Sequence, residues 1–427
     1  MNKSVVVKKR TLIQYLLCYL LILTSGAVLW TYVLDFIGFK ALVVLLIDIV
    51  LIIKYRIKVP MLFVAYSIVL MAFLIILTYI TDGYFIGNDF NSTLSMLIYA
   101  LLAYVIYKID ETSSSLVYIR TVSFFAIVSI FFWGIQVVFG SKAFPEFLFT
   151  DVNYRAEYGY LFYTICKIDL RNYGIFYEPG VYQTVLSVAL FLLLYNDNLI
   201  LKKTERRKYL VVLVITMLTT KSTTGYLSLA FLLIPYVLSR NGRKRLKALV
   251  ILGIIVGIIG LDCILNANDS LLFRVVLAKF AGINFSNGRY NYASSGGARV
   301  YLIDIALRVL STRPFTGLGA NSLFSEHFKG TYWETNGAGN ILCMTIAKRG
   351  ILFTLFCISF FLLKAFNNKN SIYSFIAFVL VFFNTVFAQS QLVYAVFAFA
   401  AFSNLRIMKL TTTENHNFLK TKHCFGL

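Results

Sequence analysis

The chain has 427 residues, of which 59% are hydrophobic and only 14% are charged, and its mean hydropathy is +0.77. A soluble globular protein is typically about 45–50% apolar and about 25% charged. A soluble core of this size could not bury so much apolar surface, and disordered chains have low hydrophobicity instead. The composition therefore predicts an all-α polytopic integral membrane protein.

The chain is strongly basic, with 40 Lys and Arg against 19 Asp and Glu and a formal charge of +21. In a soluble protein this excess would suggest a nucleic-acid partner. In a membrane protein Lys and Arg gather in the cytoplasmic loops, so we expect the bilayer as a partner and no nucleic acid. The six cysteines are scattered without a C-x-x-C pair and predict neither a metal site nor a disulfide framework. We expect no cofactor.

Transmembrane helices are expected wherever about 20 mostly apolar residues follow one another. About twelve stretches approach this pattern and form one membrane domain over residues 1–427. The predicted spans are 11–34, 36–53, 59–80, 92–109, 116–139, 175–195, 209–221, 223–238, 246–266, 338–365, 371–388 and 391–408.

Lys and Arg in the short connections set the predicted orientation. The basic N-terminus and the basic alternate loops place both chain ends in the cytoplasm, with 410–427 as a cytoplasmic tail. Two long segments, 140–173 and 267–337, then lie on the outer face as periplasmic or extracellular loops.

These two outer segments contain more cations than the positive-inside rule predicts. The first segment includes Arg155 and Arg171, and the second includes Arg289, Arg299 and Arg308. Long loops escape the rule, so one interpretation is solvated surface charge. The other is an anion site, because guanidinium groups bind phosphate through two parallel hydrogen bonds and stay charged.

Three further ionisable residues have two interpretations each. Glu178 precedes Pro179 at the start of a span, and is either a general base and partner of Arg171 or a carboxylate at a helix N-terminus. Lys221 lies between two apolar stretches, and is either functional or snorkels to the interface. His327 in the second outer segment is either a proton acceptor or a solvated surface residue.

Four stretches resemble motifs of one family. The first reads Arg171-x-x-Gly-Ile-Phe-x-Glu-Pro and is similar to an R-x-x-G-I-F-x-E-P run before a span. The second reads Thr220-Lys-Ser-Thr-Thr-Gly-Tyr-Leu and is similar to T-x-S-R-T-G-x-L. The third joins Gly297-Ala-Arg299, through a helix, to Pro314-x-x-Gly-x-Gly319, similar to a G-x-R helix with a P-x-x-G-x-G exit. The fourth joins Asn340-Ile-Leu to Lys348-Arg349-Gly350-Ile-Leu, similar to H-N-x-x-L followed by E-x-G-I-L.

Taken in this order, the motifs resemble the bacterial O-antigen and capsular polysaccharide polymerases of the Wzy type, within the O-antigen polymerase and ligase superfamily. The chain departs from the family pattern at Thr223, Gly339 and Lys348, where the family has Arg, His and Glu. Lys221 is a candidate substitute for the missing Arg, and His327 for the missing His.

The resemblance implies a glycosyltransferase in the bacterial plasma (inner) membrane. Its substrates are undecaprenyl-diphosphate-linked repeat units delivered by a flippase, and a chain-length regulator is a further expected partner. The implied catalytic residues are Arg171 and Arg299, which grip the diphosphate leaving group, with Glu178 or His327 as proton acceptor. The implied substrate-binding residues are Arg155, Lys221, Arg289 and Arg308.

Two alternatives stay open at this point. An O-antigen ligase would transfer the glycan to the core of lipid A instead of to another repeat unit. A flippase or transporter for lipid-linked oligosaccharides would carry polar groups inside its spans, for which Asp48 and Asn384 are the candidates.

Overall fold

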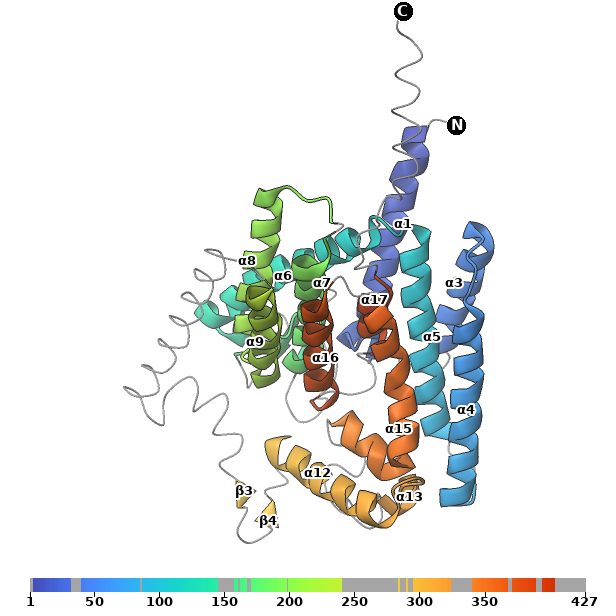
Figure 1. Ribbon diagram of the computed structural model, residues 1–427. Helices are drawn as coiled ribbons and strands as arrows, with labels where there is room; N and C mark the ends of the chain where they lie inside the picture. The colour runs from blue at the N-terminus through green and yellow to red at the C-terminus, as the bar shows by residue number, and fades with distance from the viewer. Residues whose placement is uncertain are drawn as a thin grey trace, which may run out of the picture.

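The computed structural model describes residues 3–31, 40–84, 87–144, 157–159, 162–166, 170–197, 199–239, 283–284, 289–290, 295–323, 340–367, 371–388 and 394–403. These residues are mostly helical, as the composition predicts, and form a bundle with its helices largely side by side (Figure 1). The helices of the first half are α1 (Lys3–Thr24), α2 (Val28–Thr31), α3 (Lys40–Tyr55), α4 (Met61–Asp82), α5 (Gly87–Ile109), α6 (Ser114–Phe139), α7 (Pro179–Tyr195), α8 (Lys203–Thr219) and α9 (Thr223–Leu238). The helices of the second half are α12 (Ser295–Thr312), α13 (Ala320–Leu323), α15 (Ile341–Asn367), α16 (Ile372–Val386) and α17 (Tyr394–Phe402).

Four of the described helices are long and apolar enough to cross a membrane: Met61–Asp82, Asp89–Ile109, Ser114–Phe139 and Ile341–Asn367. Shorter apolar helices occupy Leu12–Thr24, Pro179–Tyr195, Thr223–Leu238 and Ile372–Val386. Every predicted span overlaps a described helix except 246–266, which lies outside the described residues. The described residues are thus mostly helical and include four candidate membrane spans, which is consistent with the predicted all-α membrane protein.

The first predicted span, 11–34, is wrong as one continuous helix. Helix α1 ends at Thr24, and the short α2 begins only at Val28. The hydroxyls of Thr24 and Ser25 both donate to the carbonyl of Leu21, at 2.9 Å each, and Gly26 follows with a φ of 103°. Hydroxyl groups that compete for helix carbonyls and a left-handed glycine together end a helix that hydropathy alone would continue.

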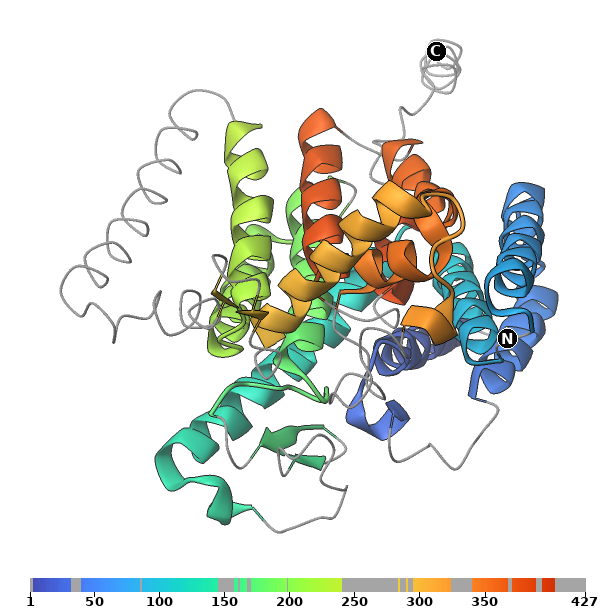
Figure 2. The same ribbon diagram turned by 90° about the horizontal axis from the view of Figure 1, so that it is seen from below.

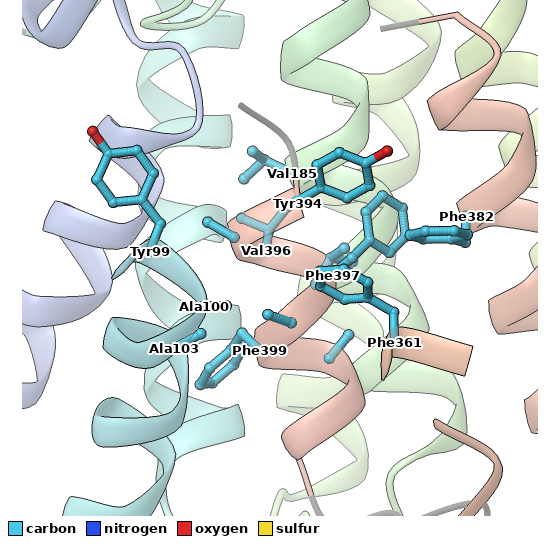
Figure 3. Close-up of a cluster of buried hydrophobic side chains, with 14 of the residues drawn as sticks. Tyr99, Ala100, Ala103, Val185, Phe361, Phe382, Tyr394, Val396, Phe397 and Phe399 are labelled. Atoms are coloured by element: carbon cyan, nitrogen blue, oxygen red, sulfur yellow. The ribbon is translucent and has the colours of Figure 1, made fainter. Parts of the chain in front are cut away.

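The centre of the bundle is α7, in which every residue from Pro179 to Tyr195 is buried. Aromatic rings from the last helices pack beside it (Figure 3). The rings of Phe361 and Tyr394 stack with centroids 5.4 Å apart, and those of Phe382 and Phe397 meet edge to face at 5.2 Å. Burial on every side places α7 in the core of the bundle.

Helix α15 replaces the continuous span predicted at 338–365 by two helical pieces. The break is at Gly350, with φ 78° and ψ 175°. In Figure 1 the first piece lies nearly across the end of the bundle, and the second piece runs along it. Only the second piece is therefore aligned with the other helices.

The segments predicted as long outer loops contain secondary structure. In 140–173, β1 (Glu157–Gly159) pairs antiparallel with β2 (Thr164–Cys166). In 267–337, β3 (Ile283–Asn284) pairs with β4 (Arg289–Tyr290), and α12 and α13 follow. Both figures show α12 running across the end of the bundle (Figures 1 and 2). Its buried stripe of Leu302, Ile305, Ala306 and Val309 has the helical spacing of a face packed on neighbouring helices.

Candidate functional site

The first motif contacts the residue just before the second motif in a polar cluster, here called the Asn172 cluster: Ser129, Asn172, Gly174, Tyr182 and Thr219. The hydroxyls of Ser129 and Tyr182 lie 2.8 Å apart. The amide nitrogen of Asn172 donates to the hydroxyls of Thr219 at 3.0 Å and Ser129 at 3.2 Å, and its amide oxygen accepts from Gly174 N at 3.0 Å. The backbone N–H of Asn172 also donates to Thr219 O at 3.0 Å. One buried side chain thus joins the segment before α7 to the end of α8 and to α6.

The strand β2 holds the same segment from its other side. The N–H of Thr164 donates to the carbonyl of Gly174 at 2.6 Å. Gln136 of α6 donates to Cys166 O at 2.9 Å and accepts from the Tyr163 hydroxyl at 3.0 Å. Burial raises the pKa of Tyr163, so its hydroxyl stays protonated and able to donate. The backbone that carries Arg171 is therefore fixed by strand and helix together.

Arg171 lies at the edge of this anchored segment and is half-buried. Its guanidinium lies over the ring of Tyr173, 5.8 Å from the centroid, with Nη2 3.5 Å from the Tyr173 hydroxyl. Next to it, Trp133 Nε1 donates to Leu170 O at 2.9 Å. A guanidinium stacked on an aromatic ring has its plane held in one orientation.

Glu178 is the residue immediately before α7, with an extended backbone (φ −144°, ψ 134°) and Pro179 in the first turn. Its carbonyl accepts from the N–H groups of Val181 at 3.1 Å and Tyr182 at 3.2 Å. Its side chain makes no capping hydrogen bond. The Glu178 side chain therefore does not cap α7 by a hydrogen bond. It lies at the N-terminus of α7, near the positive end of the helix dipole, so the interpretation as a carboxylate stabilised by that dipole stays open beside that of a general base.

Lys221 lies in the turn between α8 and α9, where the second motif begins. It is exposed and has a φ of 46°, one of two positive φ values outside glycine among the described residues. A non-glycine residue in this region is strained, and such residues gather at functional turns. The Ser222 hydroxyl caps α9 by accepting from Gly225 N at 3.4 Å.

The third and fourth motifs also meet. The turn 314–319 docks on the break in α15 through three backbone hydrogen bonds: Leu318 N to Ala347 O at 2.8 Å, Gly319 N to Lys348 O at 3.1 Å, and Ile351 N to Pro314 O at 2.7 Å. A Cβ atom on Gly350 would lie 2.5 Å from the Phe315 carbonyl, and one on Gly317 would lie 2.5 Å from the Lys348 carbonyl carbon. The two glycines allow this close contact between backbones.

Beside this docked turn is a buried ion-pair network, here called the Arg349 cluster: Asp82, Asp89, Lys348 and Arg349. Arg349 Nη1 lies 2.8 Å from Asp82 Oδ2, and Nη2 lies 2.6 Å from Asp89 Oδ2. Lys348 Nζ lies 3.4 Å from Asp89 Oδ1. Arg349 Nη1 also donates to the Thr81 hydroxyl at 3.0 Å. The cluster ties the adjacent ends of α4 and α5 to the break in α15.

The remaining predicted site residues are on or near α12. Arg308 is on this helix with its side chain 74% exposed, and its Nη2 lies 2.8 Å from Asp304 Oδ2. Arg299 is in the first half of α12, and Arg289 is in β4. Arg155 and His327 lie outside the described residues.

The structure thus brings the predicted residues together in two groups. Arg171, Glu178 and Lys221 belong to the segments joined by the Asn172 cluster, whereas Arg299 and Arg308 are on the helix that leads into the docked turn. The prediction from sequence missed the Arg349 cluster. A usable signal was present, because an Arg close to an apolar span needs a carboxylate partner, and Asp82 and Asp89 flank another predicted turn.

Comparison with known proteins adds one match. Residues 209–352 match the family model described as O-antigen ligase. The matched segment runs from within α8 through α9, α12 and the docked turn to just past the break at Gly350. No curated protein matches the chain. The match covers about a third of the chain and is consistent with the resemblance of the four motifs to the O-antigen polymerase and ligase superfamily.

Proposed function

We propose that the chain is a polymerase that joins undecaprenyl-diphosphate-linked oligosaccharide repeat units into O-antigen or capsular polysaccharide, at the outer face of the bacterial plasma membrane. The observation that carries the proposal is the pairing of the motifs: Arg171 is anchored at the end of the bundle where α7 begins, and α12, with Arg299, runs across that end (Figure 2). The family match supports glycosyl transfer in general.

In the proposed reaction, a hydroxyl oxygen of the incoming lipid-linked unit attacks the anomeric carbon of the growing chain. The new glycosidic bond forms as the bond from that carbon to the diphosphate oxygen breaks. Negative charge develops on the departing lipid diphosphate, and fixed guanidinium donors stabilise such charge. We assign this role to Arg171 and Arg299, with Arg155, Lys221, Arg289 and Arg308 as further contacts to the substrate.

The attacking hydroxyl must lose its proton, and Glu178 is the proposed acceptor. Its carboxylate is partly exposed and makes no hydrogen bond to the first turn of α7, so it is not committed to capping. It also follows Arg171 by seven residues on the same anchored segment. His327 is the second candidate for this step.

We also propose that the substrates reach the site from a flippase and that a chain-length regulator limits the product. A flippase follows from a reaction at the outer face on lipid-linked units that are made on the other side of the membrane, whereas the chain-length regulator is carried over from the family resemblance alone.

A ligase is the second candidate function, since the matched family model carries the description O-antigen ligase. The two reactions share donor and leaving group and differ only in the acceptor. The transporter alternative loses one of its two residues, because Asn384 donates to Thr224 O at 2.8 Å and to the Ser228 hydroxyl at 2.7 Å. These bonds give Asn384 a structural role between α16 and α9.

The test is complementation of a deletion strain with Arg299→Ala or Arg171→Ala, with surface glycan displayed on a gel. We expect the ladder of polymer to be lost at unchanged protein level in the membrane. The matched control is Arg207→Ala, which removes an exposed Arg near the start of α8 and should keep the ladder. Full-length polymer from Arg299→Ala would remove the proposed role of that residue.

A further inference from the structure

The Arg349 cluster has no part in the proposed reaction, yet two of its four charged side chains are almost fully buried. The side chains of Arg349 and Asp82 are 2% and 1% exposed. Its two carboxylates and two cations compensate one another. Such a network binds no further ion, because its charges are already paired, and it acts instead by fixing the elements that carry it.

The elements it fixes include the docked turn. The break at Gly350 takes two carbonyls, of Ala347 and Lys348, and the N–H of Ile351 out of the regular helical pattern. The turn 314–319 supplies the partner of each of these groups. Asp82 of the cluster also accepts from Asn321 N at 3.0 Å, at the start of α13 just after the turn. The turn is therefore held by backbone bonds on one side and by the Arg349 cluster on the other.

We propose that Arg349 is a positioning residue, which holds the docked turn and thereby sets the place of α12 and its arginines over the end of the bundle. The inference rests on the proposed function for the role of those arginines. Arg349 itself does not touch substrate in this account. It acts through Asp82, the turn 314–319 and the C-terminal end of α12.

Because α12 is long, the position of Arg299 depends strongly on how the C-terminal end of the helix is held. Arg299 precedes Thr312, the last residue of the helix, by 13 residues, which corresponds to about 20 Å of helix axis. A tilt of about 10° at the C-terminal end would move the Arg299 backbone by roughly 3 Å. A displacement of about 1 Å at a reacting group can lower a rate by about 100-fold.

The first test measures the position of α12 without any enzymatic assay. In a background with all six cysteines replaced by alanine, Ala306→Cys puts one thiol on the buried face of α12, where Ala306 is 3% exposed. The protein in lipid nanodiscs is labelled with a polar maleimide. We expect Arg349→Gln to raise the labelling rate about tenfold, because labelling of a buried thiol follows the population of the opened state.

Controls separate a local effect from general loosening. Ala27→Cys reports on a buried site beside Phe176, at the other motif pair, and its labelling should stay unchanged in Arg349→Gln. Lys108→Gln removes a cation from the exposed pair with Glu111 and should change neither site. Arg349→Lys, which keeps the charge without the planar fork, should give an intermediate rate at Ala306→Cys.

A second variant keeps the proposal testable where Arg349→Gln does not accumulate. Gly317→Ala puts a methyl group against the Lys348 carbonyl and disturbs the docked turn without touching a buried charge. It should raise labelling at Ala306→Cys in the same way. Unchanged labelling in the variants that accumulate, or an equal rise at Ala27→Cys, would overturn the proposal.

A second readout separates this inference from the proposed function. In the complementation assay, Arg349→Lys should give more polymer than Arg349→Gln at equal protein level. If labelling at Ala306→Cys becomes faster while the surface glycan is unchanged, the positioning of α12 is supported and the assigned reaction is not. If the labelling rate is unchanged while the polymer is lost, the proposal that Arg349 positions α12 is contradicted and the assigned reaction is not.

Discussion

Arg349 Nη1 lies 2.8 Å from Asp82 Oδ2, although the two residues are 267 positions apart in the chain. The contact joins the end of α4 to the break in α15, and Asp89 at the start of α5 completes it at 2.6 Å. A buried ion pair is costly to break, because the charge that remains has little water to solvate it. This contact joins α4 and α5, from the first half of the chain, to α15, from the second half.

The first prediction concerns the stability of that closure. Arg349→Met leaves Asp82 and Asp89 buried without their common cation. We expect a loss of about 3–5 kcal/mol in the free energy of unfolding. Thermal unfolding of the purified protein in detergent measures it. Lys364→Met, which removes a cation near the end of α15 far from the break, should lower stability much less. Equal melting temperatures for both variants would contradict the importance of the network.

The second prediction concerns Asn172. Asn172→Ala removes three side-chain hydrogen bonds in a fully buried site, and we expect a loss of about 2–3 kcal/mol. Limited proteolysis near Arg171 should become faster, because the segment before α7 loses the hydrogen bonds that hold it to α6 and α8. Thr121→Val is the matched control, because its hydroxyl donates only to Val117 O of its own helix at 2.8 Å. Asn172→Ala with unchanged proteolysis would show that the cluster does not hold this segment.

The third prediction uses the strained backbone of Lys221. Lys221→Gly relieves a φ of 46° and should stabilise the turn by about 1 kcal/mol. Its polymer yield should nevertheless fall, because the cation is lost. Because the turn is expected to become more stable, reduced glycan on the gel would report the loss of the Lys221 side chain and not a loss of folding. Lys221→Gly with the wild-type ladder would assign Lys221 to the interface as a snorkelling residue.

The fourth prediction separates Arg308 as a substrate contact from Arg308 as half of a surface pair. Exposed ion pairs contribute about 0–1 kcal/mol, so Arg308→Ala and Asp304→Ala should both leave the melting temperature nearly unchanged. Both variants break the same pair at 2.8 Å, but only Arg308→Ala should reduce the polymer. A similar reduction of polymer by Asp304→Ala would show that the activity depends on the Arg308–Asp304 ion pair and not on the Arg308 guanidinium itself.

Local sequence signals predicted the ends of two helices well. The predicted span 175–195 starts four residues too early, but Pro179, which has no backbone N–H and a fixed φ and can open a helix at its first turn, is where α7 begins. The helix predicted to end before Pro314 ends at Thr312. In both places the backbone chemistry of proline decides the boundary whatever surrounds it.

The break in α15 and the Arg349 cluster depend on distant segments and could not be predicted in the same way. Gly350 alone in an apolar stretch is compatible with a continuous span, and only the docked turn around Pro314 explains its backbone. Arg349 lies inside the predicted span 338–365, which signals that it needs a carboxylate partner but does not indicate which one. Its partners, Asp82 and Asp89, are contributed by another part of the chain, and hydropathy carries no information on such pairing.

The most direct test of the central claim is deletion of the gene followed by gel display of the surface glycan. A polymerase predicts that the ladder is replaced by core carrying a single repeat unit, with normal polymer restored by the intact gene. Loss of every repeat from the surface, with lipid-linked polymer accumulating in the membrane, would contradict the polymerase and establish the ligase instead.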